Sequence, residues 1–465
     1  MNIFENLNLS QKNVHFIGIG GAGMAPLASI IKERGFIVSG SDEKESYITD
    51  KLKDKGIEIS IGHKGSNIGN ADYVVYSAAV HDDNPEIRAA KEKNIITIKR
   101  SKFLGDFVNQ FSKMVAVSGS HGKTTTSSMI TEILINAGKD PTAIVGAENK
   151  INDRNHRNGN SEFAVCEACE FMDSFLDLEP YMGIILNIDD DHLDYFKDME
   201  TEKKSFKKFA KKCKKILVIN SENYNALEIT GEINIDKVFY GIKNNENFKD
   251  LNFYAQNEIS DNNGFYEFDM VSEFSKKMVK TKLKIPGIHN ISNALAASSA
   301  CERLGVDIEI SSRVLSDFVG VKRRFEKIGQ VGNIKIIDDY AHHPTEIDAL
   351  FNTISSMKFR ESWIIFQPHT FSRTFLLMDD FVKSLSKFDN VIIADIFASR
   401  EINVYEISAK TLGNKIKNCR FVGSLSEISR FVVPELKDND LLLTVGAGNV
   451  DDCAHEILSN MLQVT

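Results

Sequence analysis

Apolar runs rich in valine and isoleucine alternate with amphipathic stretches along most of the chain. Residues 14–35 open with such a run, pass through a glycine-rich turn and continue with a helical pattern, and residues 114–138 repeat this order. Further apolar runs begin near residues 334, 363, 390 and 441. Apolar runs that alternate with helical patterns are typical of parallel sheets flanked by helices. The pattern therefore predicts an α/β fold.

The length of the chain predicts more than one domain. Its 465 residues are too many for a single core, so we expect two to four domains. Residues 99–107 and 320–329 lie between the repeating patterns and mark candidate boundaries. The stretch from about 230 to 284 is polar and Asn-rich, which predicts an antiparallel or loop-like elaboration of the middle domain.

Composition narrows the possible partners and the location. The formal net charge of −9 disfavours a nucleic-acid partner, because phosphate backbones select for a basic face. The N-terminus has no leader pattern, and apolar runs such as 74–80 are too short to cross a bilayer, so we expect a cytoplasmic protein without a membrane partner. Cys166 and Cys169 form a CxxC without a second ligand pair, which favours packing over metal binding.

The first glycine loop matches G-x-G-x-x-G between a strand-like and a helix-like segment. Such a loop lets the backbone approach a pyrophosphate at a helix N-terminus. The pattern leaves three interpretations open: a dinucleotide cofactor, a nucleotide-linked substrate, or a tight turn without ligand. The candidate binding residues are Gly18, Gly20, Gly21 and Gly23, with Asp42 at the end of the next strand for a ribose or base contact.

The second glycine loop, GSHGKTTT at 119–126, is typical of nucleoside-triphosphate binding. It is a shortened variant, because Gly119 stands only three residues before Gly122. Lys123 is positioned for the β- and γ-phosphates and Thr124 for Mg²⁺. The predicted ATP-binding residues here are Gly119, Ser120, His121, Gly122, Lys123, Thr124 and Thr125. A dehydrogenase has no use for this second loop, and we find no guanine-reading N-K-x-D segment of a GTPase.

Polar clusters follow several of the apolar runs, where parallel sheets place functional groups. Glu167 and Glu170 are candidate metal ligands, because Mg²⁺ prefers carboxylate oxygen. For the other clusters a helix cap, a solvated turn or a structural histidine is the alternative. They comprise Asn187, Asp191, His192 and Asp194; His289, Asn290 and Asn293; Asp338, Asp339, His342 and His343; and His369 with Arg373.

Taken together, these motifs resemble those of the Mur ligases of bacterial peptidoglycan synthesis. The resemblance covers nearly the whole chain: after a GIGGxGM loop come, in the family's order, G-x-H-G-K-T-T-T, N-I-x-x-D-H-x-D, G-x-H-N-x-x-N-A, D-D-Y-x-H-H-P-T-E-I and P-H-x-x-S-R-T. The opening loop and DDYAHHPTEI point to the alanine-adding branch. One departure is visible, since many members of this branch read E-A-D-E-S-D where this chain reads E-A-C-E-F-M-D. That change leaves the roles of Cys169 and Asp173 open.

The resemblance implies three domains and assigns a ligand to each. A Rossmann-like domain over 1–106 is expected to hold UDP-N-acetylmuramate on the first glycine loop, with Asp42 near the ribose or uracil. A P-loop ATPase-like α/β domain over 107–321 is expected to bind ATP, with His289, Asn290 and Asn293 on the adenine side. A Rossmann-like α/β domain over 322–465 is expected to bind L-alanine. Thr124, Glu170 and His192 resemble the ligands of two Mg²⁺ sites.

The implied chemistry is ATP-dependent amide formation through an acyl phosphate. Lys123 would neutralise charge on the transferring phosphoryl group, and Arg373, with His369, would grip the carboxylate of the amino acid. His343 and His192 are both candidates to accept the proton of the amine. The alternatives are a sibling ligase that attaches a peptide in recycling, a non-catalytic nucleotide sensor and an NAD oxidoreductase. The oligomeric state stays open.

Overall fold

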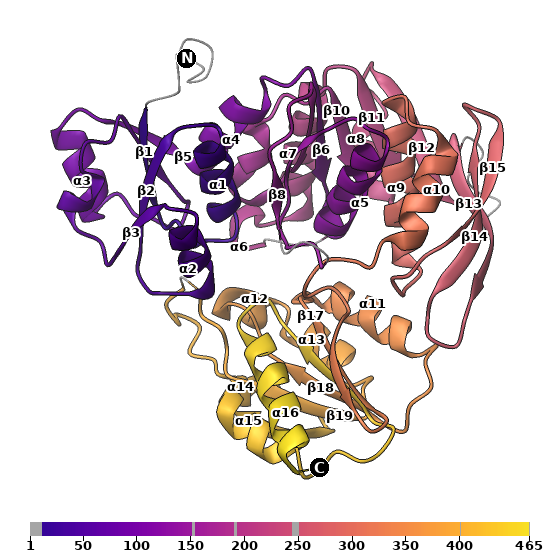
Figure 1. The fold of residues 1–465 in the computed structure, drawn as a ribbon. Helices are drawn as coiled ribbons and strands as arrows, with labels where there is room; N and C mark the ends of the chain where they lie inside the picture. The colour runs from indigo at the N-terminus through magenta and orange to yellow at the C-terminus, as the bar shows by residue number, and fades with distance from the viewer. Residues whose placement is uncertain (1–11, 151–153, 190–192, 244–250, 400, 465) are drawn as a thin grey trace.

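The computed structural model describes residues 12–464 except 151–153, 190–192, 244–250 and 400. These residues form three sheets, each covered by helices, and Figure 1 shows the third sheet below the other two. The expected α/β class is confirmed. Within the described part of the chain, no helix is both long and apolar enough to cross a membrane.

The N-terminal sheet has five parallel strands in the order β3-β2-β1-β4-β5. The order reverses beside β1, and the first glycine loop leaves β1 at this switch point, where α/β sheets bind ligands. Phe16 and Val75 are fully buried in the core beneath it. The strands are β1 (Asn13–Ile17), β2 (Ile37–Asp42), β3 (Glu58–Ile61), β4 (Tyr73–Tyr76) and β5 (Ile96–Lys99), with helices α1 (Ala25–Glu33), α2 (Tyr47–Asp54), η1 (Gly65–Ile68), α3 (Pro85–Glu92) and α4 (Arg100–Val108).

The central sheet has ten strands in the order β15-β14-β13-β12-β11-β10-β6-β9-β7-β8. Strands β13 to β7 in this order run parallel, and both ends of the sheet are antiparallel. The strands are β6 (Lys113–Ser118), β7 (Thr142–Ile144), β8 (His156–Arg157), β9 (Phe163–Glu167), β10 (Met182–Ile185), β11 (Ile216–Asn220), β12 (Asp236–Ile242), β13 (Phe253–Ser260), β14 (Tyr266–Ser272) and β15 (Lys277–Lys282). The polar stretch from about 230 to 284 thus holds an antiparallel meander, as the sequence predicts.

Helices on both faces of the central sheet bury its apolar strands. Helix α5 begins at Lys123, directly after the second glycine loop, and packs against α9. The lysine-rich stretch 203–215 lies largely on α7, whose Phe206 and Phe209 are fully buried while most of its lysines face outward. The helices are α5 (Lys123–Asn136), η2 (Phe171–Asp177), α6 (Leu193–Phe196), α7 (Met199–Lys212), α8 (Tyr224–Thr230), α9 (His289–Arg303) and α10 (Ile308–Asp317).

The C-terminal sheet has six strands in the order β16-β17-β21-β18-β19-β20, all parallel except the edge strand β16. Its strands are β16 (Glu326–Val331), β17 (Ile334–Asp339), β18 (Ser362–Phe366), β19 (Asn390–Ala394), β20 (Cys419–Gly423) and β21 (Leu441–Val445). Its helices are α11 (Pro344–Ile354), α12 (Phe371–Leu376), α13 (Met378–Leu385), α14 (Ala409–Gly413), α15 (Leu425–Val432) and α16 (Val450–Val464). Helix α12 packs against α6, so this domain contacts the central domain.

Candidate active site

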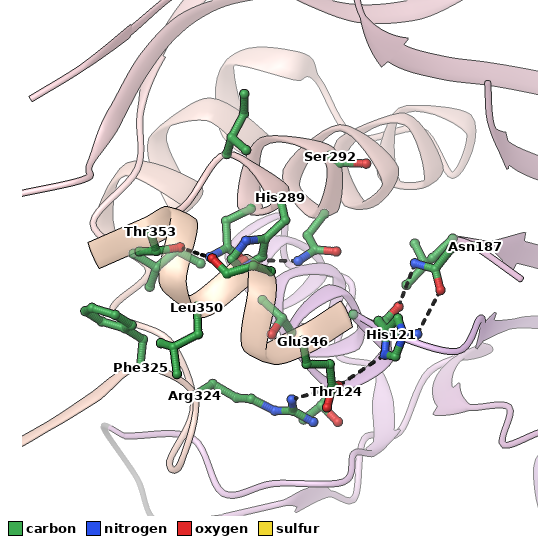
Figure 2. A pocket seen from close by; sticks show the side chains of 18 of the residues that line it. His121, Thr124, Asn187, His289, Ser292, Arg324, Phe325, Glu346, Leu350 and Thr353 are labelled. Carbon is green, nitrogen blue, oxygen red and sulfur yellow. Dashed lines mark hydrogen bonds and ion pairs between the residues drawn. The ribbon is translucent and has the colours of Figure 1, made fainter. Parts of the chain in front are cut away.

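A cavity of about 440 Å³ lies where the central and C-terminal domains meet. Figure 2 shows α11 of the third domain crossing its mouth, opposite the start of α5 and of α9. The size suits a nucleotide-sized ligand. Its lining includes His121, Gly122, Thr124, Thr125, Asn187, His289, Asn290 and Asn293 from the central domain, and Arg324, Phe325, Asp339, Glu346, Leu350 and Thr353 from the C-terminal domain.

The backbone of the second glycine loop requires glycine at two positions. Gly119 and Gly122 have φ of 139° and 86°, which other residues adopt only with strain. Asn187, at the end of the neighbouring strand, holds the loop through two hydrogen bonds. Its Oδ1 accepts from the His121 N–H at 2.8 Å, and its Nδ2 donates to the His121 carbonyl at 3.1 Å. The loop is therefore held open around the N-terminus of α5, where free N–H groups attract phosphate.

Lys123 is held inside this loop by a buried carboxylate. Its ammonium lies 3.0 Å from both carboxylate oxygens of Glu170 and donates to the carbonyls of Gly119 and Ser120. The Glu170 side chain is fully buried. The ion pair keeps a positive charge at the mouth of the phosphate loop, where the transferring phosphoryl group needs it.

Glu167, the last residue of β9, lies beside Thr124. The Thr124 hydroxyl and the Gly146 N–H donate to its carboxylate, but desolvation outweighs them and raises the pKa of Glu167. A desolvated carboxylate next to a hydroxyl, at the entrance of a phosphate loop, fits Mg²⁺, which prefers oxygen ligands and shares them with substrate phosphates. Among the described residues, no group of three His, Cys, Asp or Glu is placed to hold a metal ion.

The three residues expected on the adenine side lie at different depths of the cavity. Asn293 reaches the phosphate loop itself, because its Oδ1 accepts from Thr126 at 3.2 Å, and its amide donates to Asn290 at 3.0 Å. His289 lies toward Thr353 at the opposite end, where Ile242, Ile285 and Leu350 supply apolar walls for a base. The enclosing walls and the Arg324 charge lower the pKa of His289, so the ring is neutral at pH 7.

A carboxylate of the C-terminal domain contacts the second glycine loop directly. Glu346 of α11 lies 3.2 Å from Nδ1 of His121 and 3.7 Å from Arg324. Burial alone would raise the pKa of Glu346, but His342, His121 and Arg324 hold it well below its usual range. The third domain is thereby tied to the phosphate loop by a charged contact, visible in Figure 2.

Several histidines and one arginine of the C-terminal domain lie on the same side as the contact between Glu346 and His121. The His343 ring lies 5.4 Å from that of His121, and the His342 ring lies 5.8 Å from that of His369. His369 stacks on Phe397 and accepts from the Arg373 guanidinium at 3.4 Å. Arg373 and His369, predicted for the amino acid, and His343, one of the two residues predicted for proton transfer, thus all lie on the C-terminal side of the domain interface.

The first glycine loop is organised by its own carboxylate. Oδ2 of Asp42 accepts from the N–H of Gly20 at 2.8 Å, so this side chain shapes the loop as well as standing at its edge. A Cβ on Gly20 would lie 2.9 Å from that oxygen, and one on Gly23 would lie 2.9 Å from the Arg100 guanidinium. Arg100 is thus a nearby cation for a pyrophosphate, and Gly21 completes the turn by donating to Gly18.

A second carboxylate lies below this loop, fully buried in the N-terminal domain. Glu86 accepts from Ser41 at 2.8 Å and from Asn67 at 3.0 Å, and it lies 2.9 Å and 3.0 Å from ring nitrogens of His15 and His63. Burial raises the pKa of Glu86, but these hydrogen bonds outweigh it and lower the pKa to about 2. The carboxylate is therefore satisfied within its own domain.

Most predicted residues of the second loop and of the C-terminal cluster come together, but some site residues were not predicted. Glu346 and Arg324 line the cavity, although in the sequence Glu346 stands out only as part of a motif and Arg324 only as part of a boundary segment. Of the two carboxylates predicted from the sequence as candidate metal ligands, Glu167 lies beside Thr124, whereas Glu170, the one that the resemblance favours, pairs with Lys123. His192, and Asp191 beside it, lie outside the described residues, so its predicted roles stay predictions.

Comparison with known proteins matches this chain over all three sheets. Residues 13–112 match the model described as Mur ligase family, catalytic domain; 117–301 match Mur ligase middle domain; and 323–448 match Mur ligase, glutamate ligase domain. The fold and site thus define a three-domain nucleotide-dependent ligase, and the chain belongs to the Mur ligase family.

Two similar proteins carry the name of the same enzyme, UDP-N-acetylmuramate–L-alanine ligase. The chain is 43% identical to the UDP-N-acetylmuramate–L-alanine ligase of Caldicellulosiruptor saccharolyticus over 448 residues, 95% of this chain and 97% of the relative. It is 43% identical to the same enzyme of Clostridium novyi, over 96% and 97% of the two chains. The solved structure of UDP-N-acetylmuramate–alanine ligase from Thermotoga maritima matches with a TM-score of 0.83 at 28% identity, over 97% and 100% of the two chains.

A structure of a murein peptide ligase shares the fold at lower similarity. A murein peptide ligase from Psychrobacter arcticus matches with a TM-score of 0.76 at 23% identity, over 97% and 98% of the two chains. This likeness shows the common architecture alone.

Proposed function

We propose that this protein joins L-alanine to the lactyl carboxylate of UDP-N-acetylmuramate in peptidoglycan precursor synthesis, using ATP and an acyl-phosphate intermediate. The observation that carries the proposal is the cavity in which Thr124 of the phosphate loop meets Arg324 and Glu346 of the C-terminal domain. Glu167 bonds to Thr124 beside this cavity. The similarity to UDP-N-acetylmuramate–L-alanine ligases over 95% of the chain supports the substrate pair.

The phosphate loop performs the first half of the reaction. ATP lies with its base between His289 and Leu350 and its phosphates on the N–H groups at the start of α5. The lactyl carboxylate, presented by UDP bound on the first glycine loop, attacks the γ-phosphate. Lys123 leaves Glu170 to accompany the negative charge that spreads over the transferring group.

Thr124 and Glu167 are the residues we propose to hold Mg²⁺, with Glu170 and His192 as the remaining predicted ligands. When bound, the ion supplies positive charge that offsets the charge of the phosphates. The raised pKa of Glu167 supports this assignment, because a desolvated carboxylate gains most from a cation. The protein itself contributes orientation, through the bonds from Gly146 and Thr124.

The C-terminal domain supplies the amino acid. The Arg373 guanidinium matches a carboxylate in two-pronged fashion, and His369 holds it in place from one side. Contact between Glu346 and His121 closes this domain on the phosphate loop. Closure excludes water, which would otherwise hydrolyse the acyl phosphate.

We place the reaction in the cytoplasm, with small molecules as the partners and without a nucleic-acid or membrane partner. The acidic net charge of −9 supports the exclusion of nucleic acid.

Phosphate release tests the proposal. The protein is incubated with Mg²⁺, ATP and UDP-N-acetylmuramate, and L-alanine, glycine, L-serine or a muropeptide-type tripeptide is added. We expect release to depend on the UDP-sugar and to be fastest with L-alanine. Preference for the tripeptide would assign the recycling reaction instead, and release without any acceptor dependence would contradict the ligase assignment.

A further inference from the structure

We propose that Arg100 binds the lactyl carboxylate of the UDP-sugar and holds it between the first and the second glycine loop. The inference rests on the proposed function and adds a substrate-binding residue to it. Its basis is a half-buried guanidinium that, within the described part of the chain, has no partner of its own.

The guanidinium of Arg100 carries five N–H donors and a permanent positive charge. Among the residues that the structure describes, it makes no hydrogen bond and no ion pair. Other cations at this junction are engaged: Lys102 lies 2.6 Å from Asp106, and Arg34 donates to Thr142 at 3.1 Å. Because a partly buried arginine is usually paired, the unpaired guanidinium points to an anionic ligand.

Arg100 lies against the third glycine of the first loop. A Cβ on Gly23 would lie 2.9 Å from its Nη1, 3.2 Å from its Cζ and 3.5 Å from its Nε. The guanidinium therefore occupies space that a larger residue at position 23 would fill. Glycine at this position admits the arginine, which thereby lies directly beside the loop that is proposed to hold UDP.

The same residue begins the helix that faces the central domain. Arg100 is the first residue of α4, which packs against η2, the segment that directly follows Glu170. The packing is close, because a Cβ on Gly105 of α4 would collide with the carbonyl oxygen of Asp177. Figure 1 shows α4 between the N-terminal and the central sheet. Arg100 thus lies at the junction of the two domains.

Cys169 shows that the charge of Arg100 is felt close to the second loop. Burial and the charge of Glu170 raise the pKa of this thiol, while the charges of Lys123 and Arg100 act in the opposite direction. Cys169 directly precedes Glu170, which lies 3.0 Å from Lys123. Arg100 therefore lies on the side of the first loop that faces the phosphoryl-transfer site.

The UDP-sugar carries two kinds of anion, the diphosphate and the lactyl carboxylate, and the charge of a guanidinium suits either. The first loop already offers other donors to the diphosphate. The N–H groups of residues 18–21 bond within the protein, whereas those of Ala22 and Gly23 have no acceptor among the described residues and face the start of α1. The carboxylate must instead extend toward Lys123, on the side where Arg100 lies.

Charge explains why the carboxylate needs a cation. A carboxylate that approaches the γ-phosphate of ATP meets a group of the same sign, and the repulsion grows as water is excluded. A guanidinium on one carboxylate oxygen offsets this repulsion while the other oxygen attacks phosphorus. The attack forms the O–P bond of the acyl phosphate, and ADP leaves with the electron pair of the broken P–O bond. Lys123 thus serves the phosphate, and Arg100 serves the nucleophile.

Calorimetry with two UDP-sugars tests the assignment. UDP-N-acetylglucosamine keeps the diphosphate and lacks the lactyl group, so it reports on the first loop without the carboxylate. We expect Arg100→Gln in the full chain to weaken binding of UDP-N-acetylmuramate about 10- to 100-fold, the usual effect of losing hydrogen bonds to a charged group. Binding of UDP-N-acetylglucosamine should stay within about threefold of wild type, which also shows that the N-terminal domain is folded.

Two further variants serve as controls. Lys102→Gln removes a cation of the same helix that pairs with Asp106, and it should change neither affinity by more than about threefold. Arg100→Lys keeps the charge without the planar fork, so it should lose less affinity for UDP-N-acetylmuramate than Arg100→Gln does.

A carboxamide analogue isolates the contact between the carboxylate and Arg100. In this analogue an uncharged amide replaces the lactyl carboxylate of UDP-N-acetylmuramate. The wild-type protein should prefer the carboxylate form, and Arg100→Gln should lose that preference, which a merely structural role would not change. In initial-rate kinetics Arg100→Gln should raise the KM for UDP-N-acetylmuramate and leave the KM for ATP unchanged.

Three results would overturn the proposal. An equal loss of affinity for both UDP-sugars would assign Arg100 to the diphosphate, and unchanged affinity for both would leave it without a role in binding. A preference for the carboxylate form that persists in Arg100→Gln would place the carboxylate on another residue. If the wild-type protein binds neither UDP-sugar, the proposed function itself fails, and the assignment of Arg100 fails with it.

Discussion

The first and second glycine loops share a backbone plan and differ in the charges around it. Each follows a parallel strand, turns on glycine at positive φ (Gly18 in the first loop, Gly119 and Gly122 in the second) and opens a helix. The first has Asp42 bonded to its own backbone and the Arg100 guanidinium beside Gly23. The second contains Lys123 and Thr124, with two carboxylates against them. One loop is built to hold a pyrophosphate, and the other to transfer a phosphoryl group.

The buried carboxylates in the domains of the two loops also differ, in the direction of their pKa shifts. Glu86, in the domain of the first loop, has four polar partners that lower its pKa to about 2 against the effect of burial. Glu167, beside the second loop, has a raised pKa because desolvation outweighs its two hydrogen bonds. A carboxylate satisfied by its own domain stabilises the fold, whereas one left short of positive charge is suited to bind a cation. Glu167 therefore belongs to the proposed chemistry and Glu86 to the stability of the N-terminal domain.

The largest expected effect comes from removing the cation of the second loop. Lys123→Ala should reduce ATP-dependent product formation at least about 1,000-fold, because the charge of the transferring group loses its partner. Binding of UDP-N-acetylmuramate, measured by calorimetry, should not change. Turnover near the wild-type rate would contradict the assignment of the phosphate loop.

Glu167→Gln and Glu170→Gln separate the metal ligand from the partner of Lys123. We expect Glu167→Gln to lower the rate about 100-fold and to raise the Mg²⁺ concentration needed for half-maximal activity, as loss of a ligand does. Glu170→Gln should lower the rate with a smaller change in the Mg²⁺ requirement. If Glu170→Gln raised the Mg²⁺ requirement more than Glu167→Gln did, the result would instead support Glu170 as the metal ligand, as the resemblance implies.

Matched glycine substitutions test the loops against each other. A Cβ at Gly20 would lie 2.9 Å from Asp42, and one at Gly122 would lie 2.6 Å from Asn293 at a φ of 86°. We expect Gly20→Ala to raise the KM for the UDP-sugar about tenfold and Gly122→Ala to raise the KM for ATP by at least that factor. Initial-rate kinetics with each substrate varied check this. If either substitution raised both KM values, the two loops would not bind their substrates independently.

The smallest expected effect on catalysis belongs to Glu86. Because its folded pKa is depressed, its contribution to stability is present above the unfolded value and is lost as pH falls toward about 2. The shift corresponds to about 3 kcal/mol at pH 7. Glu86→Gln should lower the free energy of unfolding in urea by about 2–3 kcal/mol at pH 7 while kcat is kept.

The stability difference between wild type and Glu86→Gln should narrow as the pH is lowered below about 4.5, because the wild-type carboxylate then approaches its own titration range. A difference that does not depend on pH would mean that packing, and not the charge of Glu86, stabilises the N-terminal domain.

The sequence predicted the repeated strand–loop–helix elements. It did not predict how side chains from different elements lie relative to one another. Strand–loop–helix order located both glycine loops, since glycine spacing and apolar runs are local signals. The choice between Glu167 and Glu170 was not local. Glu167 ends β9, and the chain then turns so that Glu170 faces Lys123, which residue spacing alone does not reveal.

Contacts between domains were equally beyond the sequence. The link between His121 and Glu346 joins residues 225 positions apart. His342 and His343 are adjacent in the chain, yet a carbonyl orients one and a helix N-terminus the other. Hydrogen-bond partners decide which nitrogen carries the hydrogen, and a sequence does not specify those partners before the fold is known.

Oxygen labelling tests the central claim most directly. The lactyl carboxylate of UDP-N-acetylmuramate is labelled with ¹⁸O, and the reaction is run with ATP, Mg²⁺ and L-alanine. Transfer of the γ-phosphoryl group to that carboxylate predicts one ¹⁸O atom in each molecule of released phosphate, detected by mass spectrometry. Unlabelled phosphate alongside formation of the amide would contradict it, because the carboxylate oxygen would then never have been bonded to phosphorus.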